Sequence, residues 1–98
     1  MAFPLRAVWR WEEAMSGAPF RVLVVAPKRR LRHAVDRNRA KRQMREALRL
    51  AAPSLPTAEG RALCLAVLWV SDKPVPSIRV ASAVETLIEK IRSALPQS

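Results

Sequence analysis

The densest group of chemically active side chains in the sequence is a run of arginine and lysine between residues 28 and 49. Ten basic residues lie there against Asp36 and Glu46, so this run carries +8 of the formal net charge of +10. Charge concentrated in this way is typical of a surface that binds a phosphate backbone, and an anionic membrane is the second candidate. The run predicts a binding surface for a polyanion.

Residues that could carry catalysis or hold a metal are few. Cys64 is the only cysteine and His33 the only histidine, which excludes a disulfide framework, a zinc cluster and a Cys/His nucleophile pair. The acidic residues are dispersed, without a carboxylate cluster or a Ser/His/Asp set. We therefore expect no catalytic residue and no metal site, and we expect Cys64, inside an apolar run, to be a buried small hydrophobic residue.

A helix that presents the basic residues on one side is predicted from about Val35 to Ala52, where good helix formers dominate and neither glycine nor proline occurs. At 100° per residue, one sector about 100° wide holds Ala40, Met44, Ala47, Leu48 and Ala51. The opposite side, which we call the arginine ridge, holds Asn38, Arg42, Arg45 and Arg49. Like charges at these spacings repel by a few tenths of a kcal/mol per pair. The ridge therefore favours a bound counter-charge, and arginine favours bidentate contact with phosphate.

The other predicted elements form a sheet and a second helix. Strict alternation over residues 3–11 indicates a half-buried strand, and the β-branched run 20–26 is predicted to pair with it as a hairpin. The nearly continuous apolar run 61–70 indicates a central strand covered on both faces. Ser77 is expected to cap a last helix, whose packing stripe is Val80, Val84, Leu87, Ile88, Ile91 and Leu95. This order predicts an α+β fold, a small two-layer sandwich with helices packed on a sheet.

Two other uses of a basic helix fit the sequence less well. A leucine-zipper basic region needs a continuing heptad helix, which Pro53 and Pro56 forbid. A membrane-surface helix needs large apolar anchors, whereas the apolar side here is mostly alanine. No run approaches 18 consecutive apolar residues, so we expect a cytoplasmic protein without a membrane partner.

The segment "AVDRNRAKRQMREALR" resembles the signature of the bacterial ribonuclease P protein family, A-V-x-R-N-R-x-K-R-x-x-R-E. Every fixed position of that pattern is occupied, by Ala34, Val35, Arg37, Asn38, Arg39, Lys41, Arg42, Arg45 and Glu46. The resemblance extends over essentially the whole chain. It implies a single domain of this family over residues 1–98. The given sequence opens almost directly on the first strand, so we expect the family's N-terminal helix to be missing from it, through truncation, through a start codon placed too late, or because the protein lacks this helix.

The resemblance also implies a fold and a function. The fold would be a mixed sheet with a left-handed βαβ crossover, as in the second domain of ribosomal protein S5. The protein would be the noncatalytic subunit of a ribozyme, an endoribonuclease that removes the 5′ leader of precursor tRNA with Mg²⁺ bound mainly by the RNA. Its partners would be the ribonuclease P RNA and precursor tRNA, without an obligate protein partner.

Site residues follow from the resemblance position by position. Those expected to bind the catalytic RNA are Arg37, Asn38, Arg39, Lys41, Arg42, Arg45 and Arg49. Those expected to bind the leader are Arg6, Val8, Arg29 and Arg30. Two alternatives stay open at this point, a general basic RNA- or DNA-binding module without a ribozyme partner and, less favoured because no catalytic cluster is evident, a hydrolase that acts alone.

Overall fold

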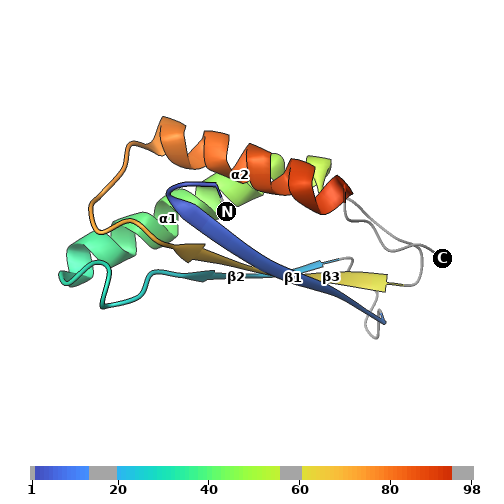
Figure 1. Ribbon diagram of the computed structural model, residues 1–98, viewed down its shortest axis with the longest axis horizontal. Coiled ribbons are helices and arrows are strands. Elements are labelled where there is room, and N and C mark those ends of the chain that lie inside the picture. Colours follow the sequence, from blue (N-terminus) through green and yellow to red (C-terminus); the bar gives the residue numbers. More distant parts are fainter. Residues whose placement is uncertain (1, 14–19, 56–60, 94–98) are drawn as a thin grey trace.

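The computed structural model describes residues 2–13, 20–55 and 61–93 of the 98. The chain forms, in order, the strands β1 (Leu5–Glu13) and β2 (Phe20–Val25), the helix α1 (Ala34–Ala51) with a short 3-10 turn η1 (Ala52–Ser54), the strand β3 (Arg61–Trp69) and the helix α2 (Ser77–Ser93). Both helices lie on one face of the sheet (Figure 1). The predicted α+β sandwich and its order of elements are confirmed, and Leu95 of the predicted stripe lies outside the described residues.

The three strands form a mixed sheet in the order β1-β3-β2. The central strand β3 pairs antiparallel with β1 and parallel with β2. The predicted hairpin of the first two strands is therefore wrong, because β3 lies between them. A nearly continuous apolar strand gains most from two neighbours, whereas β1 and β2 carry charged residues that an edge position tolerates.

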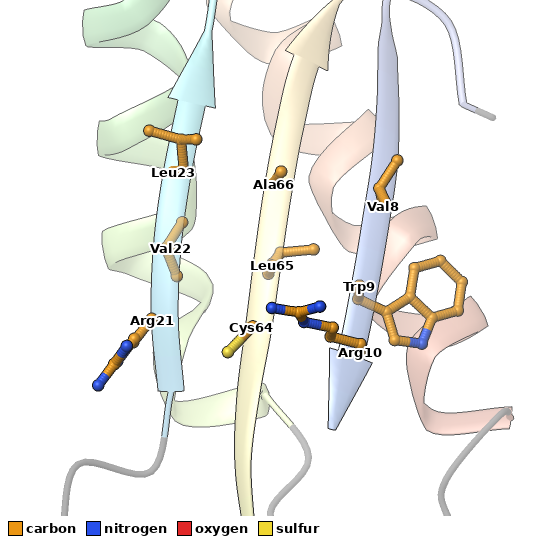
Figure 2. Close-up of a pocket in the computed structure, with 9 residues that line it drawn as sticks. All are labelled: Val8, Trp9, Arg10, Arg21, Val22, Leu23, Cys64, Leu65 and Ala66. Atoms are coloured by element: carbon orange, nitrogen blue, oxygen red, sulfur yellow. The ribbon is translucent and has the colours of Figure 1, made fainter. Parts of the chain in front are cut away.

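The connection from β2 to β3 is a left-handed crossover. Figure 2 views the sheet from the face without helices, with β2 and β3 pointing the same way. The chain leaves β2 on the left, passes through α1 behind the sheet and returns in β3 to the right of β2. This is the hand that the family resemblance implies, against the right-handed rule for most such connections.

The core lies between the sheet and the two helices. Leu5, Leu63 and Trp69 of the sheet, Met44 of α1 and Val84 of α2 are almost completely buried. Because both helices pack on the same face, no described element covers the other face of β3, and Cys64 on that face is half-buried. The prediction that this strand is covered on both faces is therefore wrong, as is the prediction that Cys64 is buried.

A buried glutamine joins the two helices. Gln43 of α1 is 9% exposed, and its Nε2 donates hydrogen bonds to the Val75 carbonyl oxygen at 2.9 Å and to the Ser77 Oγ at 3.0 Å. Ser77, expected to cap the final helix, is the first residue of α2. Removing a partner from a buried polar pair costs about 1–3 kcal/mol, so Gln43 fixes the angular position of α1, and with it the direction in which the ridge faces.

Candidate nucleic-acid interface

The arginine ridge is a solvent-facing surface of α1, as the sequence predicted. Its four side chains are all exposed, while Ala40 and Met44 on the opposite side are 1% and 0% exposed. The helix is thus held to the core by one face and offers its cations on the other. The guanidinium groups of the ridge repel one another, and the core beneath them supplies no negative charge to offset this repulsion. The ridge therefore favours binding of an external polyanion.

The members of the ridge differ in how much of their charge is available. Arg49 donates two hydrogen bonds to the Glu46 carboxylate, one of them from Nε at 3.2 Å, and this contact holds the pKa of Glu46 below its ordinary value. Within the described residues, Arg42 and Arg45 have neither an ion-pair nor a hydrogen-bond partner. The full charge of these two arginines is therefore available to a ligand, whereas part of that of Arg49 is compensated.

Two further residues expected to bind RNA flank the ridge. At 100° per residue, Arg39 lies about 100° from Asn38 on one side and Lys41 about 60° on the other. Arg39 is exposed and Lys41 is half-buried. Basic side chains therefore cover most of the outward half of α1, which widens the cationic surface beyond a single row.

Arg37 has a different environment from the other basic residues of α1. Its guanidinium Nη1 donates to the backbone carbonyl oxygens of Leu31, at 3.0 Å, and Arg32, at 2.9 Å. Both acceptors belong to the basic linker, residues 27–33, that enters the helix, and the side chain of Leu31 is buried in the core. Arg37 therefore holds the basic linker against the first turn of α1.

We expect Arg37→Ala to lower the free energy of unfolding by about 1–2 kcal/mol, because hydrogen bonds to a charged group are lost from a partly buried place. Urea unfolding monitored by circular dichroism measures this. The matched control is Arg39→Ala, which removes the same charge from an exposed position and should change stability by no more than about 0.5 kcal/mol. Equal stability of the two variants would contradict the role of Arg37 in holding the linker.

A second cationic surface lies on the helix-free face of the sheet (Figure 2). Register places Val8, Ala66 and Leu23 in one row across the three strands, and Arg10, Cys64 and Arg21 in the next. These rows form a shallow groove of about 430 Å³, the sheet groove, lined by Val8, Trp9, Arg10, Arg21, Val22, Leu23, Cys64, Leu65 and Ala66. Its lining is apolar apart from two arginines and a thiol, and it contains no acid.

Glu12 places a negative charge at one end of the sheet groove. Its carboxylate forms an ion pair with Arg10 and accepts a hydrogen bond from the Cys64 Sγ at 3.3 Å. Burial, followed by the nearby Glu12 carboxylate, raises the pKa of the Cys64 thiol above its ordinary value. Cys64 is therefore a neutral thiol at physiological pH, and it gives the groove no reactive nucleophile.

The residues expected to bind the leader lie at and beyond the other end of this groove. Arg6 and Val8 are exposed on the helix-free face, and Arg6 shares a row with Leu68 and Val25. The chain leaves β2 at Val25 and enters the basic linker, where Arg29 is exposed and Arg30 forms an ion pair with Asp72 at 3.2 Å.

Sequence reasoning placed Arg10 on the strand face with Arg6 and Val8 without counting it among the expected site residues, and it missed Arg21 and Leu23 altogether. Arg10, Arg21 and Leu23 line the sheet groove together with Val8. Alternation along each strand placed Arg10 on the same side as Arg6, but nothing in the local pattern related it to Arg21. Only the insertion of β3 between β1 and β2 brings these two arginines to either side of Cys64.

Neither a metal-binding cluster nor a membrane-spanning helix is found in the described part of the chain. No group of three or more histidine, cysteine or carboxylate side chains there could hold a metal ion. No described helix is both long and apolar enough to cross a membrane. What the described residues do present is two exposed cationic surfaces, one helical and one on the sheet.

Comparisons with known proteins relate this arrangement to one family. The family model described as "Ribonuclease P" matches residues 5–92. Among solved structures, the chain is similar to the RNase P protein of Staphylococcus aureus, with a TM-score of 0.65 and 20% sequence identity. The match covers 94% of this chain and 78% of the S. aureus chain, so the two share a fold.

Proposed function

The chain belongs to the ribonuclease P protein family, and on this premise we propose that it is the noncatalytic protein subunit of ribonuclease P. In this role it binds the catalytic RNA and the 5′ leader of precursor tRNA, and it promotes endonucleolytic removal of the leader by the ribonucleoprotein. The observation that carries the proposal is the match to the family model over nearly the whole chain, together with an arginine ridge in the segment that matches the family's signature.

The geometry of α1 supports binding of a folded RNA. A double-helical or compact RNA is engaged mainly through its phosphates and its shape, which suits a rigid row of guanidinium groups. The ridge is rigid because its helix is anchored by Met44 at 0% exposure and by the hydrogen bonds of Gln43. The full set proposed for this contact is Arg37, Asn38, Arg39, Lys41, Arg42, Arg45 and Arg49.

The sheet groove supports binding of a single strand. A leader of any sequence is held best by a cationic groove with apolar surfaces and no base-specific code, and the groove has an apolar lining with Arg10 and Arg21 at one end. Successive rows on one face of a sheet are about 6.6–6.8 Å apart, so the three rows from Arg6 to Arg10 span about 13 Å. We place the leader along these rows, with Arg6, Val8, Arg29 and Arg30 among its contacts.

Magnesium belongs to the RNA in this proposal. Mg²⁺ prefers oxygen ligands, usually one or two carboxylates with water and phosphate, and the described residues contain no group of three or more potential metal ligands. Two carboxylates near the proposed RNA surfaces, Glu12 and Glu46, are paired with arginine. In this proposal we therefore assign the ion to the catalytic RNA.

Reconstitution tests the proposed function directly. The full chain is added to the ribonuclease P RNA of the same organism at low Mg²⁺, and cleavage of a precursor tRNA is followed with and without the protein. We expect strong stimulation, and no cleavage by the protein alone. Absence of stimulation at saturating protein would refute the subunit role, and cleavage without RNA would favour a hydrolase.

Competition separates the subunit from a general basic module. Labelled catalytic RNA is bound at moderate salt and challenged with mature tRNA or duplex DNA of equal nucleotide concentration. A subunit should retain its catalytic RNA, because shape adds to the charge contribution. A general module should release the catalytic RNA to both competitors in proportion to their phosphate concentration, because its affinity arises from counterion release alone.

A further inference from the structure

A third groove lies beside the arginine ridge, between α1 and the free edge of β2. We call it the edge groove; its volume is about 390 Å³, and it is lined by Phe20, Val22, Leu23, Val24, Arg45, Leu48, Arg49, Ala52 and Leu55. Val24, Leu48 and Leu55 are buried at its base, whereas Arg45 and Arg49 are exposed. The groove thus has an apolar floor and two guanidinium groups at its rim.

Charge distinguishes this groove from the one on the other flank of α1. The groove on that other flank lies between α1 and α2 and has a volume of about 290 Å³. Its lining includes two carboxylates, Glu85 and Glu89. Its only arginine, Arg92, already forms an ion pair with Glu89 at 3.9 Å. Carboxylates there would repel a phosphate, whereas the lining of the edge groove contains no acid. Of its two arginines, Arg49 is paired with Glu46, which lies outside the lining, and Arg45 has no partner within the described residues. Of the two apolar grooves beside α1, only the edge groove is complementary to a nucleotide.

Phe20 gives the edge groove a surface on which a base can stack. Its ring is only half-buried at the start of β2, and it packs on the core with its other side. Val22 beside it is 42% exposed, and Leu23 is 61% exposed. Stacking of a base on an aromatic side chain contributes about 1–3 kcal/mol and tolerates any base. Large apolar side chains left exposed at this rim would be covered by such a base.

We propose that the edge groove binds one unstacked nucleotide of the RNA that the arginine ridge contacts. Its base lies on Phe20 and Val22, and its phosphates meet Arg45 and Arg49. This inference rests on the proposed function, because the same two arginines belong to the ridge, but it assigns RNA contacts to β2 that the ridge alone does not require. A protein strand added to the edge of β2 is the competing occupant, and the two arginines disfavour it.

Methyl NMR of the full chain tests the proposal at the groove itself. The probe is a decamer of uridine, compared with a ribose-phosphate decamer that lacks bases. We expect the decauridylate to shift the methyl signals of Leu48 and Leu55 upfield, since a base ring then lies over them, and the abasic decamer to leave them nearly unshifted. Unmoved methyl signals under conditions where decauridylate binds would overturn the proposal and favour a protein occupant.

Substitution of the aromatic ring gives an independent measurement. With the affinity taken from the Leu55 methyl titration, Phe20→Leu should weaken decauridylate binding roughly tenfold, as expected for the loss of one stacking contact, and Phe20→Tyr should stay within about twofold. The matched control is Phe3→Leu, the same change at the chain's other phenylalanine, which lies beside Arg79. Equal binding by the wild type and Phe20→Leu would refute the stacking site.

These outcomes are separable from failure of the proposed function. If Phe20→Leu binds normally while the wild type still stimulates the ribozyme, the edge groove is empty in the complex and the subunit role stands. If the wild type binds neither decauridylate nor catalytic RNA, the subunit role itself fails. Should Phe20→Leu prove unfolded by circular dichroism, the methyl shifts of the wild type still decide whether a base enters the groove.

Discussion

Replacing Arg42 and Arg45 together by alanine should weaken binding of the catalytic RNA about 30-fold at 0.15 M salt. Two phosphate contacts are lost, and each contributes about 0.9 to the logarithm of the affinity for every tenfold reduction in salt below 1 M. The slope of log affinity against log salt should become shallower by about one to two units. These two arginines are chosen because neither has a partner within the described residues, so their whole charge is free to neutralise phosphate. Filter binding between about 0.05 and 0.3 M salt measures both quantities.

A control for this variant comes from α2. Replacing Lys90 and Arg92 by alanine removes two positive charges from the last turn of α2, outside the ridge, and should leave the salt slope within about half a unit. The ridge variant should also be as stable as the wild type, or more stable by a few tenths of a kcal/mol, because repulsion along the helix is relieved. An unchanged slope in the ridge variant would exclude the ridge as the RNA contact.

The arginine ridge could be predicted because it depends on local information. Helical spacing alone puts Arg42 and Arg45 outside the sector that holds Met44, and the burial of α1 follows that pattern closely. The helix boundaries could be predicted from the run of good helix formers between the basic linker and Pro53. A surface built from one helix is therefore visible in its sequence, whatever the rest of the fold.

The sheet groove could not be predicted in the same way. Its two arginines are contributed by β1 and β2, and their relation is set by Cys64 of β3, more than forty residues later in the chain. The hairpin prediction put β1 beside β2 and would have left no room for that third strand. Long-range pairing of this kind is decided by which strand gains most from burial on both edges, and β3, with Leu63 and Val67 almost fully buried, gains most.

Two residues of α1 have partners that their types did not reveal. Arg37 is expected to bind RNA, and in the free protein its guanidinium also donates to two backbone carbonyl groups of the basic linker, which the sequence pattern did not predict. Gln43 occupies a variable position of the motif and is buried by its bonds to Val75 and Ser77. Acceptors supplied by backbone carbonyls leave no trace in a sequence pattern, so such partners become visible only in three dimensions.

The largest effect on stability is expected from Met44→Ala. Met44 is 0% exposed at the centre of the packing face of α1, and truncation of a buried methionine to alanine costs about 2–5 kcal/mol through lost burial and the cavity left behind. A small domain has about 5–15 kcal/mol in total, so the urea midpoint should fall sharply. The control is Leu50→Ala, the loss of an apolar side chain of similar size from an exposed position of the same helix, 66% exposed, which should cost less than about 1 kcal/mol.

Met44→Ala also separates the two faces of α1 by function. RNA affinity measured at low temperature, where the variant is still folded, should stay within about threefold of the wild type, because the ridge keeps all its charges. Loss of the salt slope in a folded Met44→Ala protein would mean that RNA binding depends on the packing face as well. A stability loss below about 1 kcal/mol would instead show that α1 is not anchored through this side chain. With the ridge variant, which should lose affinity and keep stability, the two substitutions distinguish charge from anchoring on a single helix.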